Sequence, residues 1–454
     1  MCSVSDDLDC LSLTSSGSGT DKSLFHATCK KCRSEPAKVV VQLKEAFCKN
    51  CLLLYVNHRF RACLGKSKLI KPKEKILVAV SGSLASATLV DLIHCGLQDT
   101  TPKRLMFSPI IVFIDDGAAL GLSNEQRLKI FQEMRIMLKN CGLSTFYVPL
   151  ESVINFEHND LKEIQSETTL SINECSVSKV RKIFEDLKSV TSKEDLLIKL
   201  RNNLLIQSAL TLNCSKILTA ETGTDLAVKL MSNIVIGRGA HLPLDVGFCD
   251  TRCTSVLLLR PLQDVSKKAV AFYVLMKGLK TVFIPAFSSI ERKNCSLQKL
   301  TENFLVGLHC EFPSTMSTIF RTGEKLSLNP LSPNFGTSSC ELCQGPLDIY
   351  ATESSAYLAT QISSAVSKYG KAAINSDGIH VMNHSSERAK NRILSSSCKN
   401  EANGTFFNPV CYGCQLILAE SNNQIHLLQN SLRKHHNQIL RDKMKEEIAD
   451  FLIE

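Results

Sequence analysis

The sequence of 454 residues contains no apolar run that approaches the length of a membrane-spanning helix. Its first ten residues, MCSVSDDLDC, are acidic and lack an apolar core, so we expect no secretory signal peptide and no contact with a membrane. Hydrophobic residues make up 44% and charged residues 21%, which is ordinary for a protein with a sizeable core. The sequence therefore predicts a cytoplasmic protein of two or three domains.

A Walker A motif is also absent, because no Gly-Lys-Ser/Thr follows the first apolar strand. Ile76–Val80 predicts a buried parallel strand, Ser81-Gly82-Ser83 a turn, and the residues from Ser86 an amphipathic helix. Such a turn directs backbone N–H groups and the positive end of a helix at one point, which suits a phosphate or pyrophosphate. An ordinary strand–turn–helix of a parallel sheet explains this stretch, taken alone, equally well.

Twenty cysteines are many for a protein without a signal peptide, so we expect them to be reduced and the paired ones to bind metal. The first two Cys-x-x-Cys pairs are separated by fifteen residues, a spacing that predicts a four-cysteine zinc site formed by Cys29, Cys32, Cys48 and Cys51.

A second candidate site has its two pairs separated by 67 residues and consists of Cys340, Cys343, Cys411 and Cys414. A polar insert at Asn383–Gly404 explains the separation, although two unrelated pairs would give the same pattern. Iron–sulfur clusters also accept four cysteines, so zinc and iron–sulfur both stay open at either site.

The formal net charge of +9 favours an anionic partner. A basic run from His58 to Lys75, opposed only by Glu74, follows the first four-cysteine group, and Tyr55 and Phe60 lie close to it. Such a run predicts contact with a nucleic-acid backbone, and a solvated connector is the alternative. The candidate contacts are Arg59, Arg61, Lys66 and Lys68.

Strand and helix patterns alternate through the middle of the chain. Five strands are expected at Ile76–Val80, Pro109–Ile114, Thr145–Leu150, Lys216–Thr219 and Ser255–Leu259. The helices expected between and after them are Ser86–Cys95, Asn124–Asn140, Lys179–Leu187, Lys193–Leu212 and Ser266–Lys277. This order predicts an α/β doubly wound parallel sheet. Asp115 follows the second strand, where such sheets bind ligands, so it contacts a nucleotide or caps the next turn.

Four parts are expected along the chain. They are a disordered tail over residues 1–25, a zinc module with a basic connector over 26–70, an α/β domain over 71–320, and a C-terminal part over 321–454. The last part holds a linker at Ile319–Ser339, the second four-cysteine group with its insert, and a charged helix at His436–Ile453. Residues 151–178 are expected to form an insertion or a long loop.

The turn after the first strand resembles the pyrophosphate loop of the N-type ATP pyrophosphatases, Ser-Gly-Gly-x-Asp-Ser. Ser81, Gly82 and Ser86 match this pattern, whereas Ser83 replaces the second Gly and Ala85 replaces the Asp. A Cβ at Ser83 hinders close backbone approach, and Ala85 carries no charge. The resemblance implies a degenerate nucleotide site at Ser81, Gly82, Ser83, Ser86 and Asp115.

The resemblance to a known family extends beyond the loop and the flanking Cys pairs to three further segments. They are Thr222-Gly-Thr-Asp-Leu-Ala227, Gly237-Arg238-Gly239 and Arg260-Pro-Leu262. Over about residues 26–420 the chain resembles the cytoplasmic tRNA 2-thiolation protein 2 family. The resemblance implies an ATP-pyrophosphatase (adenine nucleotide alpha hydrolase-like) fold flanked by two zinc modules. It also implies a heterodimer whose catalytic subunit adenylates the wobble uridine with ATP and takes sulfur from a thiocarboxylated ubiquitin-related modifier. The present chain would then bind tRNA and stabilise its partner, with no catalytic residue of its own and with ATP in the partner.

Between the third and fourth strands the chain has no Cys-x-x-Cys pair that a catalytic member would use. Cys249 and Cys253 could meet on one helical face, with Arg252 favouring a thiolate, or could simply be small buried hydrophobes. Two other functions stay open. The chain could itself be an ATP-using adenylating enzyme, because backbone amides need no side chain, or it could be a zinc-ribbon scaffold that binds only proteins.

Overall fold

A computed structural model of the protein describes residues 28–347, apart from gaps at 42–44, 99–103, 155, 157–159, 165–172, 254, 291–294 and 327–338. It also describes residues 410–421, 441, 444 and 445. The expected tail over 1–25, the polar insert and nearly all of the expected helix at His436–Ile453 lie outside the described residues. The four-part division of the chain stays a prediction.

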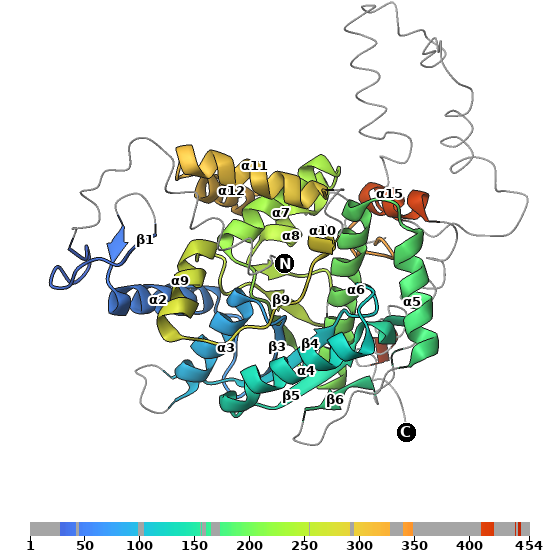
Figure 1. Ribbon diagram of the computed structural model, residues 1–454, viewed down its shortest axis with the longest axis horizontal. Coiled ribbons are helices and arrows are strands. Elements are labelled where there is room, and N and C mark those ends of the chain that lie inside the picture. Colours follow the sequence, from blue (N-terminus) through green and yellow to red (C-terminus); the bar gives the residue numbers. More distant parts are fainter. Residues whose placement is uncertain are drawn as a thin grey trace, which may run out of the picture.

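One seven-stranded sheet forms the centre of the molecule, in the order β6-β5-β4-β3-β7-β9-β8 (Figure 1). The inner five strands run parallel, and the edge strands β6 and β8 run antiparallel to their neighbours. The predicted doubly wound α/β sheet is therefore confirmed, with a mixed pattern at both edges. The strands are β3 (Lys75–Val80), β4 (Ser108–Asp115), β5 (Thr145–Pro149), β6 (Lys162–Glu163), β7 (Lys216–Leu218), β8 (Cys249–Asp250) and β9 (Leu257–Leu259).

The chain order of the sheet reverses at β3, whose neighbours are β4 and β7. At such a reversal the crossover helices pass to opposite faces, and the crevice at the carboxyl ends of the strands is the usual ligand site. Ile76, Leu77 and Val78 of β3 are all buried, as expected for a strand covered on both faces. The small-residue turn after β3 therefore begins at the switch point of the sheet.

The first half of the sheet is connected by helices that begin at polar caps. Ser83, Ser123, Asn173 and Ser189 each accept a backbone N–H at the start of a helix. These helices are α3 (Leu84–Leu97), α4 (Asn124–Leu138), α5 (Glu174–Asp186) and α6 (Val190–Thr211), with 3-10 turns η3 (Lys139–Cys141) and η4 (Leu150–Ile154) between them. The insertion expected at 151–178 contains regular structure among its described residues, since it includes η4, β6 and the first turns of α5.

The second half carries more helices than the sequence predicted. Its helices are α7 (Gly223–Val235), η6 (Gly239–His241), α8 (Leu242–Val246), α9 (Lys267–Lys277), α10 (Phe287–Ile290), α11 (Leu297–Glu311) and α12 (Thr315–Glu324). Helices α11 and α12 cover α7 through a small separate core that contains Leu226, Leu305 and Phe320. The linker expected from Ile319 is therefore wrong up to Glu324, because Phe320 is buried within a helix.

The N-terminal Cys-rich region consists of a two-stranded ribbon, β1 (Val39–Val40) with β2 (Ala46–Phe47), followed by helix α2 (Lys49–Ser67). The basic run expected as a connector is helical up to Ser67, and α2 packs against α9 beside the sheet (Figure 1). The second Cys-rich region ends in α15 (Tyr412–Glu420), which contacts α6. Among the described helices, none is both long enough and apolar enough to cross a bilayer.

Candidate functional site

The loop after β3 turns sharply at Gly82, whose φ of +78° lies in the left-handed region that favours glycine. The carbonyl oxygen of Gly82 accepts a hydrogen bond from the Val282 N–H at 2.9 Å. A Cβ at position 82 would lie 3.0 Å from both the Val282 Cβ and the Met134 sulfur. Glycine is therefore required here by backbone conformation and by close packing from behind the loop.

Serine hydroxyls in this loop bond to one another and to the loop backbone. The Ser83 Oγ caps α3 by accepting the Ser86 N–H at 3.3 Å, and it lies 3.1 Å from the Ser81 Oγ. The Ser86 hydroxyl donates back to the Ser83 carbonyl oxygen at 2.9 Å, and Ser86 is fully buried. Ser83 thus occupies a helix N–H that a bound phosphate would otherwise accept.

A cavity of about 470 Å³ lies at the carboxyl ends of β3, β4, β7 and β9. Ser81 and Ser83 of the loop line it, and so does Glu221 after β7. Its far end reaches His241 and Cys343, beside the second Cys-rich region. A single cavity therefore joins the degenerate loop to the C-terminal cysteines.

The basic side chains that line this cavity are all held by carboxylates. Arg201 pairs with Asp116, and Lys199 and Arg238 share Asp195. Burial raises the pKa of Asp195, but Lys199 and Arg238 together hold it below its usual range. Ion pairs engage each of the eight lysines and arginines that line the cavity, namely Lys199, Arg201, Lys229, Arg238, Arg252, Arg260, Lys267 and Lys299. Every lysine and arginine of the cavity is therefore engaged with a carboxylate.

Asp115 is buried and is satisfied by three donors. Its carboxylate accepts the Gly117 N–H at 2.8 Å, the Arg127 Nε–H at 2.8 Å and the Tyr147 hydroxyl at 3.0 Å. Arg127 also binds Glu151 at 2.9 Å, so Asp115 belongs to a buried polar cluster behind β4. The neighbouring Asp116 lines the cavity instead. A nucleotide contact by Asp115 stays a prediction.

The N-terminal cysteines come together as the sequence predicts. The sulfur atoms of Cys29, Cys32, Cys48 and Cys51 all lie within 4.8 Å of one another. Cys29 and Cys32 lie on a turn closed by the Arg33 N–H to Cys29 O bond of 2.8 Å, and Arg33 has a φ of +57°. Cys48 is the N-cap of α2, whose first turn contains Cys51. Four thiols at one point could hold a metal ion.

The C-terminal cysteines form a second group built on the same local plan. The sulfur atoms of Cys340, Cys343, Cys411 and Cys414 also lie within 4.8 Å of one another. The Gln344 N–H closes the first turn onto Cys340 O at 2.7 Å, and Gln344 has a φ of +56°. Cys411 is the N-cap of α15. The two pairs separated by 67 residues therefore make one group, and the alternative of two unrelated pairs is excluded.

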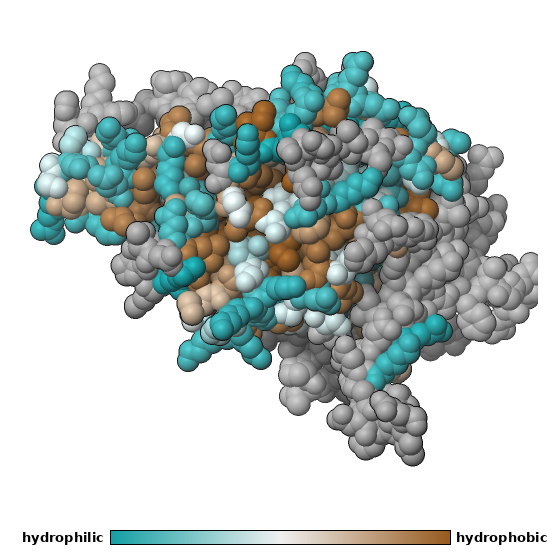
Figure 2. Space-filling model, turned by 90° about the horizontal axis from the view of Figure 1, so that it is seen from below, coloured by the Kyte–Doolittle hydropathy of each residue, from teal (hydrophilic) through white to brown (hydrophobic). Residues whose placement is uncertain are grey.

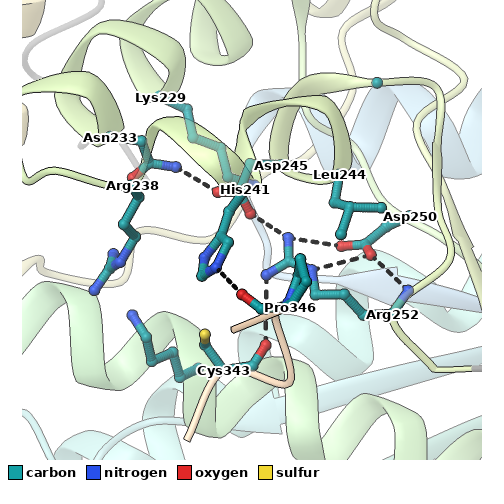
Figure 3. A network of polar contacts seen from close by, with 12 residues as sticks. Lys229, Asn233, Arg238, His241, Leu244, Asp245, Asp250, Arg252, Cys343 and Pro346 are labelled. Atoms are coloured by element: carbon teal, nitrogen blue, oxygen red, sulfur yellow. Dashed lines mark hydrogen bonds and ion pairs between the residues drawn. The ribbon is translucent and has the colours of Figure 1, made fainter. Parts of the chain in front are cut away.

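A polar network connects the C-terminal group to the cavity (Figure 3). The His241 Nε2 lies 2.8 Å from the Pro346 carbonyl oxygen, and Arg252 reaches the Cys343 carbonyl oxygen at 3.5 Å. Asp245 joins the network by binding Arg252 and by accepting from the Asn233 amide at 2.8 Å. From the sequence, Arg238 was named only as part of a motif, and His241 was not named. No local sequence pattern predicts that His241 contacts a residue about 100 positions away in the chain.

Cys249 and Cys253 do not form the helical pair that was considered from the sequence. Cys249 lies in strand β8, and Cys253 lies in a bend outside any helix. Arg252, expected to favour a thiolate, is bound to Asp245 and Asp250 instead. Burial raises the pKa of the Cys249 thiol, which favours the neutral form. The two cysteines therefore fit the role of small, partly or fully buried side chains.

Three of the four candidate nucleic-acid contacts lie on α2, and Lys68 is its C-cap. Tyr55, Arg59 and Lys66 are spaced so that they share one side of the helix. The Arg59 guanidinium lies 5.3 Å from the centre of the Tyr55 ring. Arg61 lies about 200° round the helix from Arg59 and donates to the Asn57 amide oxygen at 3.1 Å. The structure thus separates Arg61 from Arg59 and Lys66.

Comparison with known proteins points to one family. A family profile described as cytoplasmic tRNA 2-thiolation protein 2 matches residues 296–416. Cytoplasmic tRNA 2-thiolation protein 2 of Xenopus tropicalis is 33% identical over 94% of each chain, and that of Danio rerio is 32% identical over 100% of this chain and 99% of its own. Among solved structures, the chain is similar to the U34-tRNA thiolase NcsA from Methanococcus maripaludis with its 4Fe–4S cluster. The TM-score is 0.50 at 17% identity, covering 71% of this chain and 91% of the thiolase, which shows a shared fold.

Proposed function

This chain belongs to the cytoplasmic tRNA 2-thiolation protein 2 family, and from this premise we propose that it is the tRNA-handling, non-catalytic partner of a catalytic thiolase subunit. Family membership and the thiolase-like fold support a role in tRNA thiolation. The name shared by its relatives supports work in the cytoplasm. The partner would adenylate the wobble uridine with ATP and receive sulfur from a ubiquitin-related modifier.

The observation that carries the non-catalytic assignment is the engagement of every cavity lysine and arginine in an ion pair. Every lysine and arginine that lines it already has a carboxylate partner, as described above. A triphosphate brings several negative charges and needs unpaired cations or a metal to offset them. The loop adds little, because Ser83 occupies the Ser86 N–H and Ala85 has no charge with which to hold a metal.

The side of α2 formed by Tyr55, Arg59 and Lys66, which we call the α2 basic side, supports tRNA binding. An arginine stacked on an aromatic ring suits both phosphate contact and base stacking. Within the described residues, no ion pair holds Arg59, Lys66 or Lys68, in contrast to the cavity cations. These side chains therefore keep their charge available to a polyanion.

A protein partner is supported by the distribution of surface polarity. On the face shown in Figure 2, apolar side chains gather toward the middle and hydrophilic ones border them. An apolar area with a polar border is typical of protein–protein interfaces. The ubiquitin-related sulfur donor would act on the complex, because Cys249 and Cys253 do not provide this chain with a reactive pair of thiols.

We further propose that each four-cysteine group holds zinc. Four sulfurs at Zn–S distances of about 2.3 Å lie about 3.8 Å apart in a regular tetrahedron. Cys32 and Cys48 have their sulfur atoms 3.9 Å apart, and those of Cys343 and Cys411 are 3.6 Å apart. An iron–sulfur cubane binds its thiolates on separate irons and needs wider spacing. The donor set and its geometry therefore fit one zinc ion at each group, which would stabilise the fold.

Charge reversal on α2 tests the tRNA role. Measured with the intact heterodimer, Arg59→Glu with Lys66→Glu should weaken tRNA binding uniformly across tRNAs and make it less dependent on salt. The slope of log K for tRNA binding against log salt concentration should become smaller by about one for each phosphate that the double variant no longer binds. Arg61→Glu is the control, because it reverses one charge on the other side of the same helix, and Arg59→Glu alone is its equal in charge. Unchanged binding by the double variant would contradict tRNA handling by this helix. No tRNA binding by either the chain or the heterodimer would favour a protein-binding scaffold.

A further inference from the structure

His241 lies directly beneath the turn that carries Cys340 and Cys343. Its Nε2 contacts the Pro346 carbonyl oxygen at 2.8 Å. A Cβ at Gly345 would lie 2.7 Å from the His241 Cε1, so the ring packs directly against the turn backbone. His241 is only 4% exposed and is the last residue of η6 in the α/β domain. The first cysteine pair is therefore seated on a side chain from another part of the chain.

Arg238 makes the corresponding contact with the second cysteine pair. A Cβ at Gly413 would collide with the Arg238 side chain, and a Cβ at Gly237 would lie 2.8 Å from the Tyr412 ring. The Cys-Tyr-Gly-Cys segment and the Gly237-Arg238-Gly239 segment thus fit into each other. Asp195 of α6 fixes Arg238 through the two terminal guanidinium nitrogens. These close contacts explain why glycine occupies positions 237 and 413.

The supporting residues are themselves anchored deep in the α/β domain (Figure 3). Arg252 binds Asp245 and Asp250 and approaches the Cys343 carbonyl oxygen at 3.5 Å, the long limit for a hydrogen bond. Asp250 also faces Arg260, whose guanidinium donates to the Gly247 carbonyl oxygen at 2.6 Å. The cysteine turn is thus held by a chain of contacts that runs to the carboxyl edge of the sheet.

Charge favours the same arrangement. A divalent ion with four thiolates carries a net charge of about −2, which is costly to bury without cations nearby. Lys199 and Arg238 share the single carboxylate of Asp195, so this pair of cations leaves one positive charge beside Cys411 and Cys414. The domain therefore offers a metal–thiolate group both hydrogen-bond donors and compensating charge.

We propose that His241 and Arg238 are positioning residues for a metal ion at the C-terminal four-cysteine group, acting through the Cys340–Pro346 turn and the first turn of α15. The inference rests on the proposed metal occupancy. It assigns the affinity of this site to the α/β domain as well as to the cysteines. Residues that orient metal ligands in this way contribute about 10- to 100-fold to metal affinity.

Zinc release from the full-length chain tests the assignment. The zinc-loaded protein is challenged with a chelator, and release is followed with a chromogenic indicator. Cys32→Ser and Cys343→Ser identify the two phases. His241→Ala and Arg238→Ala should each weaken zinc binding at the C-terminal group by about 10- to 100-fold and leave the N-terminal phase unchanged. His241→Gln, whose side-chain amide offers a donor near the position of Nε2, should restore most of the loss.

Several results would overturn the proposal. If the two alanine variants released zinc from both groups as slowly as the wild-type protein does, these side chains would not position the ligands. Failure of His241→Gln to improve on His241→Ala would remove the role of the His241 hydrogen bond. Phe131→Leu, which loosens the buried side of α4, controls for general destabilisation, and an equal acceleration in that variant would also refute the proposal. A wild-type chain that binds neither zinc nor cobalt would instead refute the metal itself.

Discussion

The two four-cysteine groups are alike in their sulfur atoms and in the turns that carry them, and differ in how they are held in the molecule. Each has a first pair on a tight turn closed by a left-handed residue, Arg33 or Gln344, and a second pair at the start of a helix. The N-terminal group is completed within 23 residues and lies at one side of the molecule beside its own ribbon (Figure 1). The C-terminal group joins two distant segments and is seated on His241 and Arg238 of the α/β domain.

The comparison teaches that the same ligand set can serve two structural purposes. The N-terminal group organises a local module that presents α2 and its basic side. The C-terminal group attaches the end of the chain to the wall of the cavity, so its loss should reach the α/β domain. The position of this group also explains why cations of the cavity are ion-paired, since the pairs of Arg238 with Asp195 and of Arg252 with Asp245 hold side chains that contact the cysteine segments.

The largest difference is expected on removal of one ligand from each group. Cys340→Ser should lower the free energy of unfolding of the α/β domain by several kcal/mol, a part of the apparent binding energy of about 10–16 kcal/mol for structural zinc. Cys29→Ser should loosen mainly residues 28–67. Urea unfolding and hydrogen exchange, with zinc content measured in parallel, would separate the two. If both variants lost hydrogen-exchange protection equally in the sheet, the two groups would not differ in their structural purpose.

Next in size is the removal of the carboxylate that supports the second cysteine pair. Asp195→Asn would leave Arg238 and Lys199 buried without a full countercharge, which should cost about 3–5 kcal/mol of stability. Asp264→Asn, at an exposed position, should change stability by less than about 0.5 kcal/mol. Thermal and urea unfolding of both variants would measure the difference. A small effect at Asp195 would mean that the network is readily rearranged.

A third prediction concerns the residue just before the last cysteine of each group. Gly413→Ala should cost about 1–3 kcal/mol, because its Cβ would collide with the Arg238 side chain. Asn50 occupies the equivalent position in the N-terminal group and is exposed, so Asn50→Ala should have little effect. Unfolding midpoints at constant zinc concentration test the pair. If both substitutions were silent, the close fit between α15 and Arg238 would not contribute to stability.

The smallest predicted effect depends on pH. Burial raises the pKa of Glu221, but Lys229 and Arg260 outweigh it and lower the pKa to about 2. Since the ordinary pKa is near 4.5, this carboxylate stabilises the fold fully above about pH 4.5 and loses its contribution as the pH falls toward 2. Glu221→Gln should therefore be less stable than wild type at neutral pH, and the two should converge at low pH. Urea unfolding at several pH values would show whether this gap closes, and Glu185→Gln serves as an exposed control.

The five inner strands and the cysteine groups could be predicted from the sequence because both have strong local signals. Ile76–Val80 is apolar throughout, Ser266 caps α9 as expected, and the Cys-x-x-Cys spacing indicates metal binding. The edge strands β6 and β8 could not be predicted, since strands of two residues have no period. Helix α2 was not predicted, because its basic run suggested a solvated connector. Val56 and Phe60 are nevertheless buried on its inner side.

The features that the sequence could not settle concern residues whose partners are far away in the chain. The spacing of Cys249 and Cys253 left open that they meet on one helical face, but Cys249 pairs with Leu259 in the sheet. Asp115 was a candidate for a ligand contact at the end of a strand; its side chain accepts hydrogen bonds from Arg127 and Tyr147, and a nucleotide contact there stays a prediction. His241 and Arg238 have meaning only once α15 is packed against them. Sequence patterns report local structure well and report long-range polar contacts poorly.

The most direct test of the non-catalytic assignment is ATP–pyrophosphate turnover in the presence of tRNA. The assay compares this chain alone, the catalytic partner alone and the two together. Because the cavity cations are paired and Ser83 occupies a helix N–H, we predict no turnover by this chain alone and activity in the heterodimer. Turnover by the isolated chain, lost on Gly82→Val, would contradict this account and would make the chain an adenylating enzyme.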